Sequence, residues 1–194
     1  MNKDIMLCGV GGQGTVLASK IIAAAAMSEG STVHSAETIG MAQRGGSVTS
    51  HVRIGDAYSP LIPLGSAEMI LAFEPAEAVR NLAYMKKDGI VITNTVPAKP
   101  VTESLAPSGY EGAEMVEYLK NKCECIAIDA NEVCQKFGST KFLNIIMLGI
   151  AAGTGRLGID TETIAEEIKK RVPAKFVEAN IEAFALGFEI GGEK

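Results

Sequence analysis

The chain has 194 residues, of which 47% are apolar and 21% are charged, and its formal net charge is −5. The length suits a single α/β domain over residues 1–194, and the apolar content excludes a disordered chain. An acidic balance with scattered Lys and Arg argues against nucleic acid or an anionic membrane surface as a partner. The N-terminus leads straight into an apolar run, which leaves no room for a signal peptide, and no apolar run is long enough to span a membrane. We therefore expect a cytoplasmic protein.

The first predicted element is a strand at residues 4–8, followed by a glycine-rich turn and a helix over residues 15–29. The turn has the pattern G-x-G-x-x-G, in which Gly9 takes the tight turn, Gly11 lets a ligand approach the backbone and Gly14 lets the helix lie close on the strand. The start of the helix then offers unpaired N–H groups to an anion. The same pattern also suits a structural turn that binds nothing, and that alternative stays open.

A short second strand is predicted at residues 31–36, and it ends at Glu37. In a dinucleotide-binding fold, an acidic residue about 20 positions after the glycines binds the ribose hydroxyls. Glu37 is close to that place, although an ordinary loop carboxylate explains it equally well. His34 and His51 have no third ligand at metal-binding spacing, so we interpret both as hydrogen-bonded structural histidines.

The next loop, residues 38–47, combines three glycines with an amide, a cation and a hydroxyl. Gln43 and Arg44 precede Gly45, Gly46 and Ser47, and an arginine supplies a forked donor for phosphate or carboxylate. The alternative is a surface loop with an incidental arginine. Residues 47–54 then alternate between apolar and polar side chains, which predicts a half-buried antiparallel strand near a sheet edge. A plain Rossmann half would have a crossover helix there instead.

A buried strand at residues 69–73 is followed by Glu74, Pro75 and a helix through about residue 85. Glu74 either caps that helix or faces the crevice in which open α/β sheets bind ligands. The chain then predicts a strand at 90–94, a proline-rich excursion at 96–108, a helix at 111–122, a strand at 124–128 and a helix at 129–137.

Three helices close the chain, at residues 139–153, at 160–172 and from Pro173 onward. The first is apolar nearly all round, and Gly149 and Gly153 give it a small-residue face for close helix contact. The predicted fold is a doubly wound, Rossmann-like α/β fold, with a mixed sheet, helices on both faces and a helical C-terminal end. With so much apolar helix surface, we expect an oligomer or a subunit of a larger assembly.

The four cysteines are Cys8, Cys123, Cys125 and Cys134. Their spacings do not fit the four thiolates of an iron–sulfur cluster. We interpret all four as small buried apolar residues in a reducing compartment.

Read together, these motifs resemble the gamma-type component of 2-oxoacid:ferredoxin oxidoreductases, and most closely the small (beta) subunit of its indolepyruvate branch. The resemblance covers nearly the whole chain. It rests on residues 9–14, on Glu37 with residues 43–47, on residues 73–75, on residues 144–149, and on Asn180 with Ala183 and Phe184. The wider family often has an acidic residue where this chain has Gln43, which favours the indolepyruvate branch while leaving branched-chain oxoacids open.

The resemblance implies a subunit of an enzyme that oxidatively decarboxylates arylpyruvates with coenzyme A and passes electrons to ferredoxin. Thiamine diphosphate, Mg and [4Fe-4S] clusters would belong to a large partner subunit, and a homodimer of this chain stays open. The resemblance places coenzyme A at the glycine loop, and it implies no catalytic residue and no metal ligand in this chain. The candidate binding residues are Gly9, Gly11, Gly12, Gln13, Gly14, Gln43, Arg44, Gly45, Gly46, Ser47 and Glu74.

Two other functions compete with this hypothesis. A self-contained NAD-dependent dehydrogenase would bind a nicotinamide nucleotide as an isolated chain, with Glu37 on the ribose. Against this alternative, the sequence shows no convincing acid or base for hydride transfer. A nucleotide-binding regulatory module would bind its ligand without any redox partner.

Overall fold

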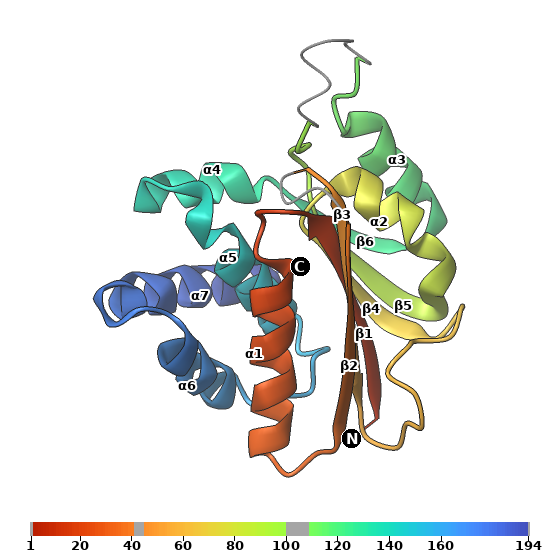
Figure 1. Ribbon diagram of the computed structural model, residues 1–194. Helices are drawn as coiled ribbons and strands as arrows, with labels where there is room; N and C mark the ends of the chain where they lie inside the picture. Colours follow the sequence, from red (N-terminus) through yellow and green to blue (C-terminus); the bar gives the residue numbers. More distant parts are fainter. Residues whose placement is uncertain (1, 41–44, 100–108, 194) are drawn as a thin grey trace.

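The computed structural model describes residues 2–40, 45–99 and 109–193, and it shows a six-stranded mixed sheet between two layers of helices. The strand order is β2-β3-β1-β4-β5-β6. Helices α1, α4, α5, α6 and α7 lie on one face, and α2 and α3 lie on the other (Figure 1). The predicted doubly wound α/β fold with a helical C-terminal end is confirmed.

Five strands run in the same direction, and β3, which lies between β2 and β1, runs in the opposite direction. β1 pairs in parallel with β4, β4 with β5 and β5 with β6, whereas β3 is antiparallel to both β1 and β2. The switch point, where the chain leaves the sheet centre in both directions, therefore lies between β1 and β4. The strand bounds are β1 Lys3–Val10, β2 Val33–Ile39, β3 Ser47–Ile54, β4 Ala67–Ala72, β5 Met85–Asn94 and β6 Glu124–Ile128.

The inserted strand β3 separates β2 from β1. In the register, Ser50 of β3 pairs with Leu7 of β1 on one side and with Glu37 of β2 on the other. Glu37 is exposed and lies two strands, roughly 10 Å, from β1. In a dinucleotide-binding half the acidic residue sits on the strand next to the glycine loop, so this sheet order removes the geometric basis for Glu37 as a ribose ligand.

The N-terminal helices begin where the sequence predicts, but α2 is shorter than expected. α1 spans Thr15–Ser28, and Gly30 follows it with φ +81°. α2 covers only Pro75–Arg80 and is followed by a 3₁₀ turn at Leu82–Tyr84. β5 then begins at Met85 rather than at Ile90, because a register shift between Ala67 and Met69 extends its pairing with β4.

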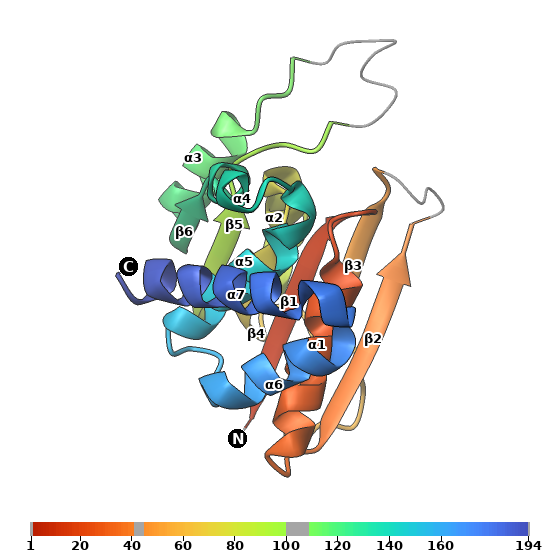
Figure 2. The same ribbon diagram turned by 90° about the vertical axis from the view of Figure 1, so that its left-hand side faces the viewer.

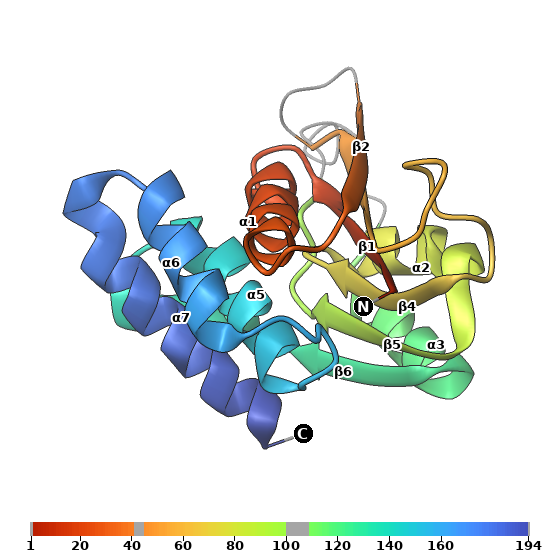
Figure 3. The same ribbon diagram turned by 90° about the horizontal axis from the view of Figure 1, so that it is seen from below.

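The C-terminal helices form a layer of their own over the α1 side of the sheet (Figures 2 and 3). α5 is buried along most of its length, and α7 packs directly on it. The close contact predicted at Gly149 and Gly153 is confirmed, and its partners on α7 are Gly187 and Gly191, which the sequence analysis did not identify. The bounds are α3 Ala113–Lys122, α4 Ala130–Cys134, α5 Leu143–Gly153, α6 Thr161–Arg171 and α7 Val177–Gly192.

Alternate residues of β1 pack into two hydrophobic clusters, one on each face of the sheet. Ile5 and Leu7 face the cluster under α1 and α5, whereas Met6 and Cys8 face the cluster under α2 and α3. All four cysteines are free; Cys8 and Cys134 are buried, but Cys123 and Cys125 are only half-buried. Burial raises the pKa of each thiol, so these cysteines are protonated near neutral pH.

His51 is a structural histidine, as predicted. Its Nδ1 accepts a hydrogen bond from the Ile62 backbone N–H at 3.2 Å, and its ring meets the Tyr84 ring edge-on at 5.6 Å between centroids. A nitrogen that accepts must be unprotonated, and burial lowers the His51 pKa below the usual value. The segment that follows β3 is therefore anchored by a neutral imidazole.

We expect this anchor to make the protein less stable in mild acid. Because the folded-state pKa of His51 is lowered, the unfolded chain takes up the proton first, and stability falls as the pH drops below about 6.5. The variant His51→Asn keeps an acceptor in a similar place and cannot titrate, so its urea midpoint should change less between neutral pH and about pH 5.5. Equal acid sensitivity in wild type and His51→Asn would contradict the prediction.

Candidate functional site

The glycine loop follows β1 and lies at the switch point beside the end of β4, where open α/β sheets bind ligands. Three of the four glycines in this loop have different roles. A Cβ at Gly9 would lie 2.7 Å from Gln13 Oε1, so Gly9 is needed for packing. Gly12, with φ +102°, has no atom within 4 Å of an added Cβ, so its backbone is open to a ligand. A Cβ at Gly14 would lie 2.6 Å from Asn144 Nδ2, so Gly14 makes room for α5.

The side-chain amide of Gln13 stabilises the glycine loop through two hydrogen bonds. Its Oε1 accepts a hydrogen bond from Val10 N–H at 2.8 Å, and its Nε2 donates to the Phe73 carbonyl at 2.9 Å. The side chain therefore ties the end of β1 to the end of β4 across the switch point. The sequence predicts that Gln13 faces a phosphate; its amide is bonded within the fold while the residue also borders a neighbouring cavity, so that role stays a prediction.

The second candidate loop is tied directly to the glycine loop. Gly11 N–H donates to Gly46 O at 2.8 Å, and Gly45 N–H donates to Gly11 O at 3.4 Å. Ser47 Oγ donates to Glu77 Oε2 of α2 at 2.6 Å. Gly45, Gly46 and Ser47 thus position the loop, and the polar backbone atoms of Gly11 are already paired. The predicted residues Gln43 and Arg44 lie outside the described residues.

Glu74 is the N-cap of α2, as the cap alternative predicted. It is buried, its Oε2 accepts from Glu77 N–H at 3.0 Å, and its Oε1 accepts from the Tyr110 hydroxyl at 2.6 Å. Burial, and then the bond to Glu74, raise the Tyr110 pKa far above its usual range, so the tyrosine remains a hydroxyl donor. Both carboxylate oxygens therefore have protein partners.

The N-terminus of α1 is the strongest anion-binding feature beside the loop. The helix has no side-chain cap. Thr15 in its first turn is only 2% exposed, and its Oγ1 has no hydrogen-bond partner in the described part of the chain. A cavity of about 480 Å³ lies here, bordered by Gly11, Gly12 and Thr15 among others. Free helix N–H groups, the helix dipole and an unpaired hydroxyl fit a phosphate group.

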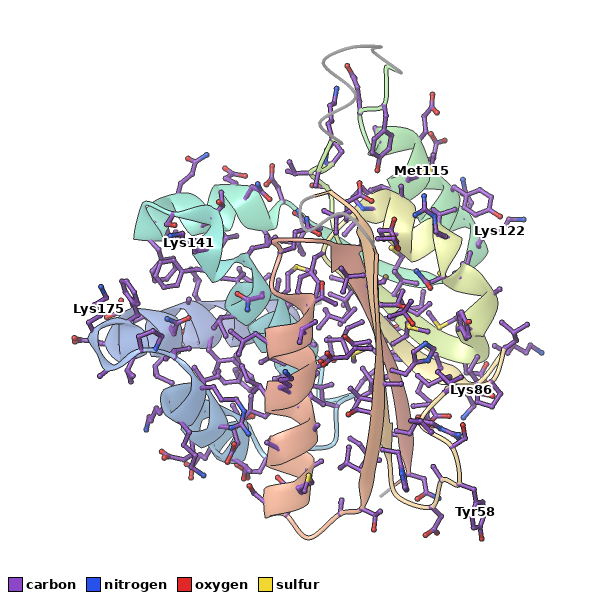
Figure 4. All side chains as sticks on the ribbon, viewed as in Figure 1. Tyr58, Lys86, Met115, Lys122, Lys141 and Lys175 are labelled. Carbon is purple, nitrogen blue, oxygen red and sulfur yellow. The ribbon has the colours of Figure 1, made fainter. Side chains whose placement is uncertain are left out.

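A second cavity, of about 640 Å³, opens on the other side of the glycine loop, and we call it the asparagine cleft. It is enclosed by the loop, the start of α5 and the connection between α6 and α7. Lys141 projects beside it, and Lys175 projects farther out on the same helical layer (Figure 4). No local pattern in the sequence predicts this cleft; of its lining, Asn144, the polar residue within the apolar stretch of α5, and Asn180 stand out in the sequence. Its lining residues are Gly12, Gln13, Gly14, Leu17, Phe137, Ser139, Thr140, Lys141, Phe142, Asn144, Val172, Pro173, Phe176 and Asn180.

Residues 2–40, 45–99 and 109–193 contain neither a cluster of metal ligands nor a membrane-spanning helix. Within these ranges, no group of three or more His, Cys, Asp or Glu side chains is placed to hold a metal ion. The protonated, separated thiols do not fit the thiolate ligands of an iron–sulfur cluster. None of the described helices is both long and apolar enough to cross a bilayer.

Comparison with known proteins gives a consistent result. Residues 4–190 match the model of the pyruvate ferredoxin/flavodoxin oxidoreductase family. The chain is 39% identical to indolepyruvate oxidoreductase subunit IorB of Archaeoglobus fulgidus, over 97% of this chain and 94% of the relative. It is 30% identical to the common gamma subunit of the pyruvate/ketoisovalerate oxidoreductases of Pyrococcus abyssi, over 96% and 95% of the two chains.

A solved structure shares the fold. It is the 2-oxoglutarate:ferredoxin oxidoreductase of Magnetococcus marinus, with a TM-score of 0.77 at 19% identity, and it matches 100% of this chain and 31% of that chain. The chain therefore belongs to the pyruvate ferredoxin/flavodoxin oxidoreductase family. Its relatives are small and gamma-type subunits, and the chain is a small subunit of a 2-oxoacid oxidoreductase of this class.

Proposed function

We propose that this small subunit supplies the coenzyme A site of a cytoplasmic arylpyruvate:ferredoxin oxidoreductase, with indolepyruvate as the first substrate to test. The observation that carries the proposal is the uncapped start of α1 with the unpaired, buried hydroxyl of Thr15. The higher identity to an indolepyruvate oxidoreductase subunit than to a pyruvate/ketoisovalerate subunit supports the choice of substrate. The Magnetococcus enzyme is described with coenzyme A and succinyl-CoA bound, which supports the choice of ligand.

In this proposal a phosphate of coenzyme A lies against Gly12 and the first turn of α1. Gly12 gives close approach to the backbone, and the N–H groups of α1 and the Thr15 hydroxyl donate to phosphate oxygens. Arg44 and Gln43 are proposed from the sequence alone, Arg44 as a clamp on the ligand. Thiamine diphosphate, Mg and [4Fe-4S] clusters, carried by a large partner subunit, supply the decarboxylation and electron-transfer chemistry. This chain binds and orients the acyl acceptor.

The test of the assembly is a tagged pull-down from the native cell under anaerobic conditions. We expect a large brown partner and viologen reduction that depends on an oxoacid and on coenzyme A, fastest with indolepyruvate or phenylpyruvate. The isolated chain should show no turnover. If the chain is recovered without a partner and binds a nicotinamide nucleotide tightly, the dehydrogenase alternative replaces this proposal.

The phosphate site is tested at Gly12, because the backbone of Gly11 is already paired with the neighbouring loop. Gly12→Ala should weaken coenzyme A binding by about tenfold or more, since a methyl group would occupy the open approach to the loop. Gly65→Ala is the matched control, because Gly65 also has positive φ and no atom within 4 Å of an added Cβ. Calorimetry should show similar folding losses for both variants and weaker coenzyme A binding for Gly12→Ala alone. If Gly12→Ala binds coenzyme A as tightly as the wild type, no phosphate of the ligand lies at this loop.

A further inference from the structure

β2 forms an unpaired edge of the sheet. It spans Val33–Ile39, pairs with β3 on one side, and has no strand on its other side within residues 2–40, 45–99 and 109–193. Figure 2 shows β2 at the margin of the sheet, with no other labelled helix or strand beyond it. An open strand edge presents unpaired N–H and C=O groups, and these groups form a template for a further strand.

The edge at β2 lacks the features that commonly protect such an edge from pairing. Its seven residues include no lysine or proline, and its register with β3 runs without a bulge. Ser35 and Glu37 are exposed. β6, at the opposite edge, has five residues, and the Arg156 guanidinium binds the Glu124 carboxylate at its start. β2 is therefore the edge at which a further strand fits.

The backbone hydrogen bonds at the two ends of β2 show which of its groups point outward. Gly55 N–H donates to the Thr32 carbonyl at 2.8 Å, and Gly40 N–H donates to the Ser47 carbonyl at 2.9 Å. Both pairs follow the register of β2 with β3, in which bonded and non-bonded pairs alternate along the strand. The even-numbered residues of β2 therefore bond to β3, and the N–H and C=O groups of its odd-numbered residues point away from the sheet.

Two copies of β2 match each other when they run antiparallel about Ala36, the middle residue of the strand. A two-fold axis normal to the sheet keeps each residue on the same face in both copies, so odd-numbered residues must lie opposite odd-numbered residues. That condition also brings the outward N–H and C=O groups of the two copies together. With Ala36 on the axis, Ser35 lies opposite Glu37 of the second copy. His34 then lies opposite Thr38, so no like charges face each other directly and each carboxylate faces a hydroxyl donor.

We propose that the assembled enzyme contains two copies of this small subunit, joined by antiparallel pairing of their β2 strands about Ala36. The two six-stranded sheets then form one continuous sheet. The helices cover the faces of the sheet and leave the β2 edge open (Figure 3). The inference goes beyond the proposed function and does not depend on the coenzyme A site.

The register is tested by cysteine cross-linking of the copurified complex. Ala36→Cys places two thiols opposite each other in a non-hydrogen-bonded pair, where the Cα atoms are about 4.5 Å apart and a disulfide can close. Thr38→Cys is the matched control, because its two copies would lie four residues, roughly 13 Å, apart along the strands. We expect mild oxidation to give a covalent dimer of this chain with Ala36→Cys alone. The wild-type chain, with its four free cysteines, gives the background.

The contact itself is tested by the charge at position 35. Ser35→Glu puts carboxylates opposite each other at two symmetric places, so the dissociation constant of the pair should rise by about tenfold in analytical ultracentrifugation of the complex. Ser35→Lys, the matched control, puts an ammonium opposite each Glu37 and should keep or tighten the association. Ser35 is exposed, so both variants should unfold at the wild-type urea midpoint.

Three results would overturn the proposal. Equal yields of covalent dimer from the two cysteine variants, including none from either, would rule out this register. A complex whose mass contains one copy of the small subunit, or unchanged association in Ser35→Glu, would rule out the dimer. Loss of the large subunit from Ser35→Glu while the two small subunits stay together would assign the edge to a strand of that partner. None of these results bears on coenzyme A binding, so failure of the dimer is distinct from failure of the proposed function.

Discussion

Replacing Gly149 by alanine will lower the free energy of unfolding by about 3 kcal/mol, at the upper end of the range for overpacked sites. An added Cβ would lie 2.3 Å from the Phe184 carbonyl oxygen and 3.0 Å from the Gly187 Cα. Both neighbours are backbone atoms, which cannot rotate away as the end of a flexible side chain can. The two helices would have to separate along their whole contact, so the loss spreads beyond one residue.

The contact between α5 and α7 is reciprocal, and for this reason a single added methyl group has a large effect on stability. A Cβ at Gly153 would meet the Phe188 carbonyl, and one at Gly187 would meet the Ile146 carbonyl. Each helix thus presents glycines to the carbonyl groups of the other, at a distance that permits weak Cα–H···O contacts. α5 also covers the sheet beside the glycine loop, so α7 holds in place the helix that carries Asn144.

The control for Gly149→Ala is Gly192→Ala in the same pair of helices. A Cβ there would meet only Gly153 O, at 3.9 Å, which is an ordinary contact. Gly192→Ala should be neutral or stabilise by up to about 1 kcal/mol through helix propensity. Urea unfolding followed by circular dichroism compares the two variants. If they unfold at the same midpoint, the helices are not as close as this geometry requires.

The parts of the fold predicted from the sequence are those with a local signal. The alternation through residues 47–54 gave the bounds of β3, and the run before Gly9 gave β1. Gly149 and Gly153 indicated a close helix contact because their spacing puts them on one face. The partner glycines of α7 were not recognised, because nothing within that helix shows which surface it meets.

The site was harder to predict, because its polar groups form hydrogen bonds with segments that are distant in the sequence. Gln13 pairs with Phe73, and Gly11 pairs with Gly46. The first pairing depends on β4 lying beside β1 and the second on β3 lying beside β1, and the motif alone contains no information on either neighbour. The glycine pattern thus located the turn between β1 and α1, and which of its groups face a ligand stays a prediction: Gly12 is open, whereas the Gln13 amide and the backbone of Gly11 have partners within the protein.

Gly14 connects the glycine loop to the asparagine cleft. It precedes α1 with φ +80°, and its missing side chain leaves the space against which the Asn144 amide packs. Asn144 is held there by shape rather than by hydrogen bonds, so any atom added at Gly14 displaces it directly. The conformation of the loop and the position of the Asn144 side chain therefore both depend on Gly14.

We expect Gly14→Ala to lower the free energy of unfolding by about 2 to 3 kcal/mol, about 1 kcal/mol of it from the left-handed backbone and the rest from the forced movement of Asn144. Gly30→Ala is the matched control, since Gly30 has φ +81° and no atom within 4 Å of an added Cβ, so it should lose only the backbone part. Coenzyme A affinity, measured by calorimetry, should fall in Gly14→Ala and stay at the wild-type value in Gly30→Ala. Equal destabilisation of the two variants with equal ligand affinity would mean that Gly14 serves only the turn, and that Asn144 owes its position to α5 and not to the glycine loop.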